Sequence, residues 1–215
     1  SANGVAAADL PFFLNLMLHL SAQGLSCPVP LARKDGGLVS TVKNKPAALV
    51  SFLEGRSVRT PRPEHCRALG AAMAQMHLAG DRFELTRPNN HGLGNWQALF
   101  ERCHSRADEV SPDLTRAMER ELTRLKENWP DNLPTGIIHA DLFPDNVFFM
   151  QGKMSGLIDF YFACNDFYAY DLAIALNAWC FEADATFNVT KARALLSGYQ
   201  NLRPLAPEAV SYTHL

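Results

Sequence analysis

One short run of residues restricts the possible folds of this chain more than any other feature. Residues 136–149 read Gly-Ile-Ile-His-Ala-Asp-Leu-Phe-Pro-Asp-Asn-Val-Phe-Phe, so that Asp141 follows His139 by two residues and precedes Asn146 by five. A second acid, Asp159, stands further on between apolar neighbours. Phosphoryl transfer needs one carboxylate that orients and deprotonates a hydroxyl, and an amide and another carboxylate that hold Mg²⁺ on ATP. The run therefore predicts short strands joined by a loop that carries this chemistry.

Each of these residues also has an ordinary structural interpretation. Asp141 alone could be a solvated turn residue and Asn146 a plain turn asparagine, but together with Asp159 they favour a catalytic base and two metal ligands. Burying Asp159 among apolar residues would be costly without a metal or hydrogen-bond partners. For His139 we favour a packed, orienting histidine over a general base. Asp171 opens an apolar helix, where an N-cap role is sufficient, although it could also brace the catalytic loop.

The composition is that of an ordinary globular protein. The 215 residues are 47% hydrophobic and 20% charged, with a formal net charge of -2. Basic residues are scattered among acids, which argues against a nucleic-acid-binding face, and no window is apolar enough to span a bilayer. The five cysteines include no pair with CxxC spacing, so neither a disulfide framework nor a zinc site is indicated. We expect a cytoplasmic protein without nucleic-acid or membrane partners, and no feature indicates its oligomeric state.

The remaining pattern predicts an α+β fold of two lobes. Apolar residues at helical spacing indicate helices, and short apolar runs between turn residues indicate strands. Helices are expected at 10–20, 64–77, from 96, from 112, at 171–180 and at 190–200, and strands at 38–42, 47–53, 137–140, 147–150 and 153–158. Asp9 is the expected N-cap of the first helix. We place the first lobe at residues 1–54 and the second at residues 55–215, with a proline-rich connector at the boundary.

The motif of His139, Asp141, Asn146 and Asp159 resembles the protein-kinase-like superfamily, and most of all the branch of aminoglycoside phosphotransferases and choline kinases. Two further stretches are similar to the homoserine kinases of this fold: Ile-Asp-Phe-Tyr-Phe-Ala-Cys-Asn-Asp at 158–166 and Tyr-Asp-Leu-Ala-Ile-Ala-Leu-Asn-Ala-Trp-Cys-Phe at 170–181. Residues 9–14, 25–28 and 52–55 fit the same family. The resemblance implies ATP and Mg²⁺ as cofactors and phosphorylation of homoserine for threonine synthesis.

The resemblance also implies binding residues. Backbone groups of a hinge between the lobes would bind adenine, over an apolar floor, and the loop after Asp159 would line the acceptor pocket. The hinge comprises Ser51, Phe52, Leu53 and Glu54, and the floor comprises Phe148 or Phe149 together with Ile158. The acceptor loop runs from Tyr161 to Asp166. Asp166 or Glu182 could pair with the ammonium of homoserine, and Asn177 or Trp179 could border the pocket.

One part of the family pattern is missing. Such kinases place a phosphate-covering loop and a strand lysine before the first buried helix, and the residues before Asp9 cannot supply them. Lys43 and Lys45 follow that helix, which itself contains no glutamate to pair with such a lysine. We therefore expect an N-terminally truncated chain with an incomplete first lobe and little kinase activity of its own. Residues 211–215 follow no pattern and carry no functional weight.

Three alternatives remain open from the residues alone. Another small-molecule kinase of the same fold, acting on choline, an aminoglycoside or a sugar, would carry the same motif around Asp141. A metal-dependent hydrolase could use His139, Asp141 and Asp159, but such enzymes usually have more histidine or carboxylate ligands. A nucleotide-binding module without catalysis is the third.

Overall fold

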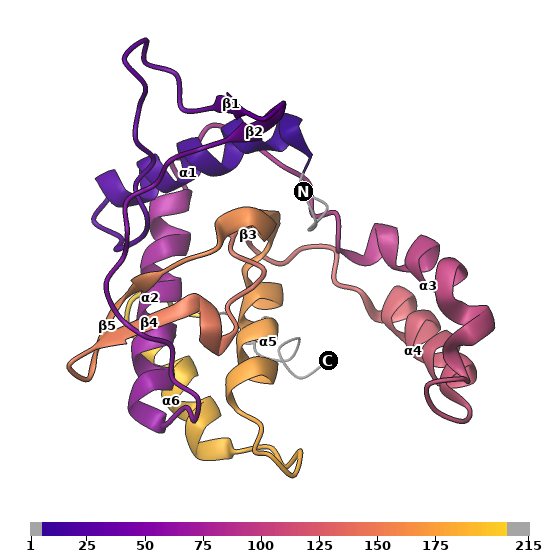
Figure 1. Cartoon of the computed structure of the whole chain (residues 1–215). Coiled ribbons are helices and arrows are strands. Elements are labelled where there is room, and N and C mark those ends of the chain that lie inside the picture. The colour runs from indigo at the N-terminus through magenta and orange to yellow at the C-terminus, as the bar shows by residue number, and fades with distance from the viewer. Residues whose placement is uncertain (1–5, 206–215) are drawn as a thin grey trace. The chain divides into compact units, whose positions relative to one another are not determined.

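The computed structural model describes residues 6–205, which form two compact units (Figure 1). Residues 88–132 make up the smaller unit, and the described residues on both sides of it in the sequence make up the larger one. The expected lobe boundary at residues 54 and 55 falls within the larger unit and stays a prediction. Residues 211–215 lie outside the described residues, and no described helix is long and apolar enough to cross a membrane.

The larger unit combines helices with three two-stranded antiparallel sheets among its described residues. Its elements in chain order are η1 (Ala7–Asp9), α1 (Leu10–Ala22), β1 (Ser40–Val42), β2 (Lys45–Ala47), α2 (Pro63–Gly80), β3 (Thr135–Ile138), η2 (Pro144–Asn146), β4 (Val147–Met150), β5 (Lys153–Leu157), η3 (Phe160–Phe162), β6 (Cys164–Phe167), α5 (Tyr168–Trp179) and α6 (Val189–Gln200). The expected α+β character is confirmed, and most expected helices lie within a few residues of their predicted bounds.

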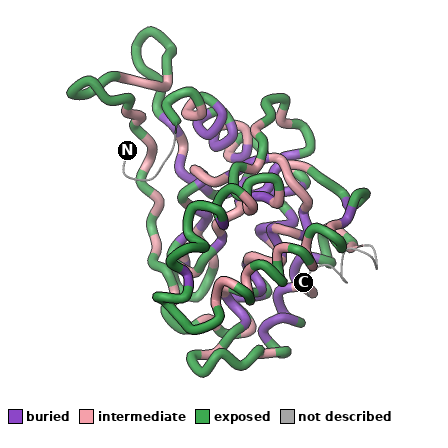
Figure 2. The backbone as a smooth tube through the Cα atoms, turned by 90° about the vertical axis from the view of Figure 1, so that its right-hand side faces the viewer, coloured by how far each residue is buried: buried purple, intermediate pink, exposed green. Residues whose placement is uncertain are grey.

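Helix α1 is buried on most sides, as its apolar sequence predicted. Six of its thirteen residues are buried, and Gly24 follows its end with a positive φ of 88° that favours glycine. The buried stretches of the trace in Figure 2 include this helix. Asp9 occupies the N-cap position, but its side chain makes no cap hydrogen bond and instead pairs with Arg87. The predicted N-cap position of Asp9 is therefore confirmed, but the side-chain hydrogen bond typical of that position is absent.

The strands after α1 are shorter than expected. Strands β1 and β2 form a hairpin whose turn residues, Lys43 and Asn44, both have positive φ. The predicted buried strand 47–53 is wrong beyond Ala47: an isolated bridge joins Val50 to Pro30, and Leu49 is exposed. A continuous apolar run suggested burial, but these residues instead follow the segment 29–31 along one edge.

Helices α2 and α6 lie side by side in the core of the larger unit (Figure 1). The close approach depends on two glycines, because a Cβ on Gly70 would meet the backbone of Leu195 and a Cβ on Gly198 would meet that of Arg67. Helix α1 contacts the end of α2, where His19 Nε2 donates to the carbonyl of Ala79 at 2.9 Å. This helical core supports the strands that carry the polar motif.

Two strand pairs frame the motif. Strands β4 and β5 form the predicted hairpin around the turn Gln151-Gly152, in which both residues have positive φ. Strand β3 pairs with β6, which we did not predict and which places Gly136 opposite Asp166. The loop that contains Asp141 joins β3 to β4, and Asp159 follows β5, so the two acids lie at neighbouring strand ends.

The smaller unit is a pair of helices, α3 (Leu93–Ala107) and α4 (Leu114–Asn128). Helix α3 is longer than the short helix expected from Trp96. The helix expected from residue 112 begins at Leu114, and Asp113 holds its N-cap position with φ of 62°. The apolar stripe of α4 faces α3, but no residue of α4 is fully buried.

Candidate active site

Asp141 and Asn146 form the centre of the candidate site. The amide nitrogen of Asn146 donates to the carbonyl of Asp141 at 2.7 Å and to its carboxylate Oδ2 at 2.9 Å. Burial raises the pKa of Asp141, the charges of Asp159 and Asp145 raise it further, and the hydrogen bond from Asn146 opposes them. Because both hydrogen bonds use the side-chain nitrogen of Asn146, they fix the orientation of the amide. The side-chain carbonyl oxygen of Asn146 is the group left for a cation.

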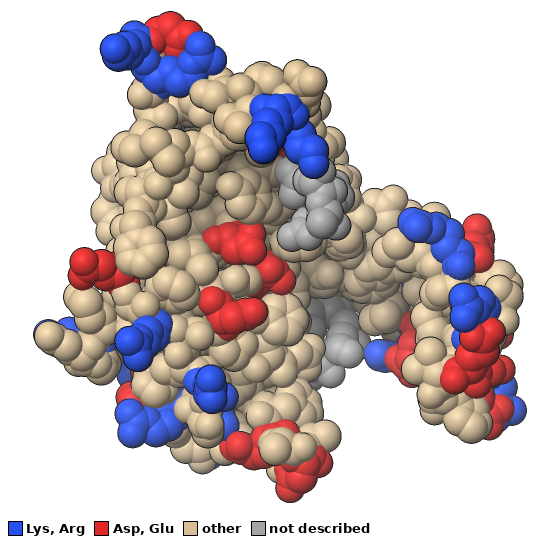
Figure 3. All heavy atoms as spheres, in the orientation of Figure 1, with Lys and Arg blue, Asp and Glu red and all other residues tan. Residues whose placement is uncertain are grey.

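Asp159 lies beside this pair. The preceding residue, Ile158, donates its backbone N–H to the carbonyl of Asn146 at 3.0 Å, and the charge of Asp159 acts on the Asp141 carboxyl. Asp159 has the left-handed conformation, with φ of 62° and ψ of 59°. A non-glycine residue in this region is strained, and such strain is common where a side chain must be aimed. Acidic side chains gather near the middle of the face in Figure 3.

Asp171 holds the backbone of the catalytic loop. Its carboxylate is fully buried and accepts hydrogen bonds from the N–H groups of His139 at 3.1 Å and Ala140 at 2.8 Å, and from His77 Nε2 at 2.9 Å. Burial alone would raise the pKa of Asp171, but the hydrogen bond from His77 and the interactions with both histidines and the Ala140 N–H outweigh it, so the pKa is lowered. Of the two predicted roles, N-capping is wrong, because Phe167 holds the N-cap position of α5, and bracing stays a prediction that these bonds support.

Ala140 shows why the brace is needed. It has a positive φ of 61°, which is unusual for alanine, directly before Asp141. The bond from its N–H to Asp171 helps to hold this conformation. The chain of contacts extends further, since Tyr199 O–H donates to Nδ1 of His77 at 2.8 Å and Trp179 Nε1 donates to the carbonyl of Leu142 at 2.7 Å.

His139 has the geometry of the predicted orienting residue. Its ring is fully buried, Nε2 donates to the carbonyl of Ile158 at 3.0 Å, and Phe160 packs against it with ring centroids 4.6 Å apart. Burial lowers the pKa of His139, so the ring is neutral at neutral pH. It therefore ties the loop of Asp141 to the segment of Asp159, away from the reacting groups.

The predicted metal-binding pair offers the oxygen donors that Mg²⁺ prefers. Among residues 6–205, no three His, Cys, Asp or Glu side chains are grouped so as to hold a metal ion. The predicted pair is different in kind, because it combines the amide oxygen of Asn146 with the carboxylate of Asp159. Mg²⁺ in kinases keeps several water and phosphate ligands and takes only one or two from the protein.

The predicted hinge runs along the β4–β5 hairpin. Ser51 N donates to the carbonyl of Val29 at 2.8 Å, and Arg56 N donates to that of Phe149 at 3.0 Å, so both ends of the segment are fixed. Between them, the backbone groups of Phe52, Leu53 and Glu54 have no hydrogen-bond partner within the described part of the chain. Backbone groups that lack internal partners are available to a ligand.

The predicted adenine floor needs a correction. Phe149 is only 8% exposed and packs between His65 and Trp179, with ring centroids 4.7 and 6.5 Å away, so it belongs to the core. Phe148 is half-buried, and its Cβ would lie 3.0 Å from a Cβ placed on Gly55, next to the hinge. A bulge lies between the two residues, and the contact with Gly55 together with the burial of Phe149 makes Phe148 the better candidate for the floor.

The structure separates the predicted acceptor residues. Tyr161 is half-buried against Phe13, with ring centroids 5.5 Å apart, and the pKa of Tyr161 is raised first by burial and then by Asp159. Asp166 lies on β6, and Asn177 is exposed on α5. These three stay predictions.

Of the other two acceptor predictions, one is wrong and one stays a prediction. Trp179 is 1% exposed, so it supports the loop and borders no open pocket. The Glu182 carboxylate accepts from Lys191 Nζ at 2.8 Å and from Asn188 Nδ2 at 2.7 Å, both through Oε1, and its pairing with a ligand ammonium stays a prediction.

Two residues that contact the candidate site were not predicted: His77 bonds Asp171, and Arg87 bonds the carbonyl of Ala163. His77 and Arg87 stand in a helix and a loop with no neighbouring pattern, and their partners are distant in the chain. The sequence indicates only that His77 falls on the apolar side of its helix, where a polar side chain needs a buried partner.

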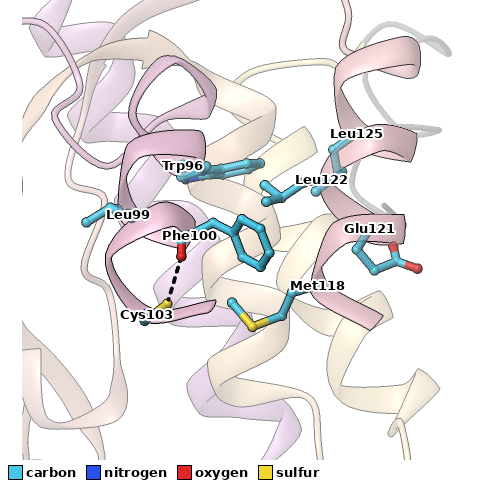
Figure 4. Close-up of a pocket in the computed structure, with 8 residues that line it drawn as sticks. All are labelled: Trp96, Leu99, Phe100, Cys103, Met118, Glu121, Leu122 and Leu125. Carbon is cyan, nitrogen blue, oxygen red and sulfur yellow. Dashed lines mark hydrogen bonds between the residues drawn. The ribbon is translucent and has the colours of Figure 1, made fainter. Parts of the chain in front are cut away.

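An apolar pocket of about 310 Å³ lies within the smaller unit (Figure 4). Trp96 and Phe100 of α3 point toward Met118 and Leu122 of α4, and Glu121 is the only charged residue that lines it. It contains none of the predicted site residues, so the polar motif and this pocket are separate features.

Comparison with known proteins bears on both fold and family. The sequence profile described as "Phosphotransferase enzyme family" matches residues 1–205. A homoserine kinase of Rhizobium etli (strain CIAT 652) is 57% identical over 207 residues, which cover 96% of this chain and 64% of that protein. A homoserine kinase of Allorhizobium ampelinum (strain ATCC BAA-846 / DSM 112012 / S4) is 58% identical over 203 residues, covering 94% and 63%. The chain thus spans slightly less than two thirds of the length of these relatives.

Solved structures agree on the fold. The structure titled "Amicoumacin kinase hAmiN in complex with AMP-PNP, Ca2+ and Ami" has a TM-score of 0.70 at 16% identity, over 97% of this chain and 68% of that one. The predicted kinase-like α+β fold is confirmed.

Proposed function

Because the chain belongs to the phosphotransferase enzyme family, we propose that it serves the ATP-dependent phosphorylation of L-homoserine to O-phospho-L-homoserine. One observation carries the proposal: Asp141 is hydrogen-bonded to Asn146, and Asp171 holds the residue before it, Ala140, in a chain 57% identical to a protein named as a homoserine kinase. A carboxylate with a raised pKa beside an oriented amide suits proton removal from a hydroxyl next to a metal. The same arrangement gives a hydrolase too few ligands.

The roles of the chain's own residues follow from this geometry. Asp141 Oδ2 accepts from Asn146, so Oδ1 would orient the acceptor hydroxyl and take its proton. Asn146 Oδ1 and the carboxylate of Asp159 would hold Mg²⁺. The ion, bound with ATP, supplies the phosphoryl group's charge neutralisation. Backbone groups of Ser51 to Glu54 would bind adenine over Phe148 and Ile158.

Homoserine also needs partners for its charged groups. We assign its ammonium to Asp166, on the strand after the acceptor loop, and a border of the pocket to Tyr161 and Asn177. The five cysteines are all free, which suits a reducing cytoplasm, and we propose that location.

The test is phosphoryl transfer from γ-labelled ATP under single-turnover conditions, with protein in excess, to homoserine, choline, an aminoglycoside and a sugar. We expect transfer to homoserine alone. Asp141→Asn should reduce the rate by about 10²- to 10⁴-fold while nucleotide binding is retained. Asp113→Asn, an exposed acid of the smaller unit, is the matched control and should leave the rate unchanged.

The other outcomes separate the alternatives. Transfer to a different acceptor would make the protein another small-molecule kinase. Magnesium-dependent binding of ATP without transfer to any acceptor would make this chain a nucleotide-binding module, and would agree with the expected low activity of the 215-residue chain. An Asp141→Asn variant with an unchanged rate would remove Asp141 from the mechanism.

A further inference from the structure

Arg87 connects two segments that lie far apart in the sequence. Its Nε donates to Asp9 Oδ2 at 3.0 Å, at the start of α1, and its Nη1 donates to the carbonyl of Ala163 at 3.2 Å, in the loop after Asp159. Its backbone forms a reciprocal pair with Asn165: Arg87 N donates to Asn165 Oδ1 at 2.8 Å, and Asn165 N donates to Arg87 O at 2.7 Å. The residue is therefore a four-point link.

The same guanidinium is sheltered and stacked. The side chain of Arg87 is 13% exposed and that of Asp9 is 28% exposed, so this pair is screened less than a surface ion pair. The guanidinium carbon lies 5.0 Å from the centre of the buried Phe13 ring, within the range of a cation–π contact. Phe13 in turn packs against Tyr161. Arg87 thus binds α1 and the acceptor loop through both polar and aromatic contacts.

These contacts join the stretches that distinguish the chain within its fold. Residues 9–14 and 158–166 both resemble the homoserine kinases in sequence, whereas the motif around Asp141 resembles the whole superfamily. The structure brings the two stretches together, and the residue between them is Arg87. The loop that Arg87 holds directly follows the proposed metal ligand Asp159. The position of this loop should therefore affect which acceptor can bind.

We propose that Arg87 is a positioning residue that holds the acceptor loop, residues 161–166, against the first turn of α1. The inference rests on the proposed function, since it assigns this loop to the acceptor. Arg87 acts through the loop and touches neither nucleotide nor reacting atoms. Its loss should therefore weaken acceptor binding while nucleotide binding is kept.

The test compares Arg87→Gln with Arg33→Gln. Arg33 is a matched control, because it also pairs with an aspartate, Asp35, at 2.6 Å and donates to a carbonyl, that of Val39, at 3.0 Å, but it lies far from the loop in sequence and does not contact it. Calorimetry would measure the dissociation constants of homoserine and of a non-hydrolysable Mg²⁺-ATP analogue. We expect Arg87→Gln to raise that of homoserine about 10-fold or more, and that of the analogue less than about 3-fold. Arg87→Lys should restore part of the affinity.

A second measurement does not depend on ligand binding. Hydrogen exchange at the amides of Ala163 and Asn165 should be about 10-fold faster in Arg87→Gln, while the amide of Phe149, bonded to Arg56 O at 2.9 Å, should be unchanged. Uniformly faster exchange would reduce Arg87 to a general structural role and overturn the inference, and so would unchanged exchange at Ala163 and Asn165. If the unsubstituted chain binds no homoserine, the proposed function fails, and the exchange measurement still decides whether Arg87 holds the loop.

Discussion

Replacing Asp171 by alanine should destabilise the protein by far more than replacing an exposed acid. The substitution leaves three donors without an acceptor: the N–H groups of His139 and Ala140 and the Nε2 group of His77. It also releases a fully buried carboxylate, which partly offsets the loss. The two effects oppose each other, so the net loss in the free energy of unfolding is smaller than the cost of the three lost hydrogen bonds.

Each orphaned buried donor costs about 1–3 kcal/mol, so three of them could cost several times that. The desolvation that is relieved is also several kcal/mol, and measured losses of one partner from a buried pair are about 3–5 kcal/mol. We take that range as the expected loss in the free energy of unfolding. For a unit of this size it corresponds to a fall in Tm of about 10 °C. Asp171→Asn keeps one acceptor oxygen and should lose less.

The assay is urea unfolding at pH 7, with Glu64→Ala as the control. Glu64 pairs with Arg62 at the surface, and its loss should change stability by less than about 1 kcal/mol. The pKa of Asp171 is lowered in the folded state, so its contribution is present above the unfolded value and is lost as the pH falls through the folded pKa. The difference between Asp171→Ala and the unsubstituted protein should therefore shrink only below about pH 4. An Asp171→Ala variant as stable at pH 7 as Glu64→Ala would refute the brace.

Two further predictions concern the catalytic loop and the floor. Asn146→Ala removes the hydrogen bond that lowers the pKa of Asp141, so that pKa should rise further. NMR should then show the Asp141 carboxyl titrating at higher pH than in the unsubstituted protein. An unchanged or lower pKa would contradict the geometry. Phe149→Ala should lower the free energy of unfolding by about 3–5 kcal/mol and leave the nucleotide affinity of the folded protein nearly unchanged. Phe148→Ala should weaken binding of an ATP analogue about 10-fold at a smaller cost in stability. The reverse result would restore Phe149 as the floor.

The parts of the structure that the sequence predicted well are those with local causes. The β4–β5 hairpin depends on alternating side chains and on the Gln151-Gly152 turn, which are neighbours in the chain. Helix α1 depends on an apolar run followed by Gly24. By contrast, β6 was missed because its residues, Cys164 to Phe167, are partly polar and find their partner strand about thirty residues upstream. Pairing across such a distance has no short-range pattern.

The candidate site divides in the same way. The order of Asp141, Asn146 and Asp159 was readable because their spacing within a motif reflects the chemistry they share. The orientation of Phe148 and Phe149 was not, because a bulge between these two residues interrupts the register of the strand pair. The binding residue that proved wrong, Trp179, was placed by resemblance alone, and its partner, Leu142, comes from another element.

Asp9 and Asp171 show what a better reading of the sequence would have required. Both stand at the start of an apolar helix, where the sequence pattern predicts an N-cap because aspartate commonly accepts a hydrogen bond from the first helical turn. In each case the carboxylate instead accepts from partners on other elements, Arg87 for Asp9 and the catalytic loop for Asp171. Asp171 is followed by apolar residues and preceded by Ala169 and Tyr170, so a cap there would have been buried with the helix. A buried cap satisfies one donor at the cost of desolvating a whole charge, whereas a buried brace can satisfy three. An aspartate inside an apolar helix start, in a chain that also contains a catalytic loop, is therefore better read first as a brace for that loop and only then as a cap.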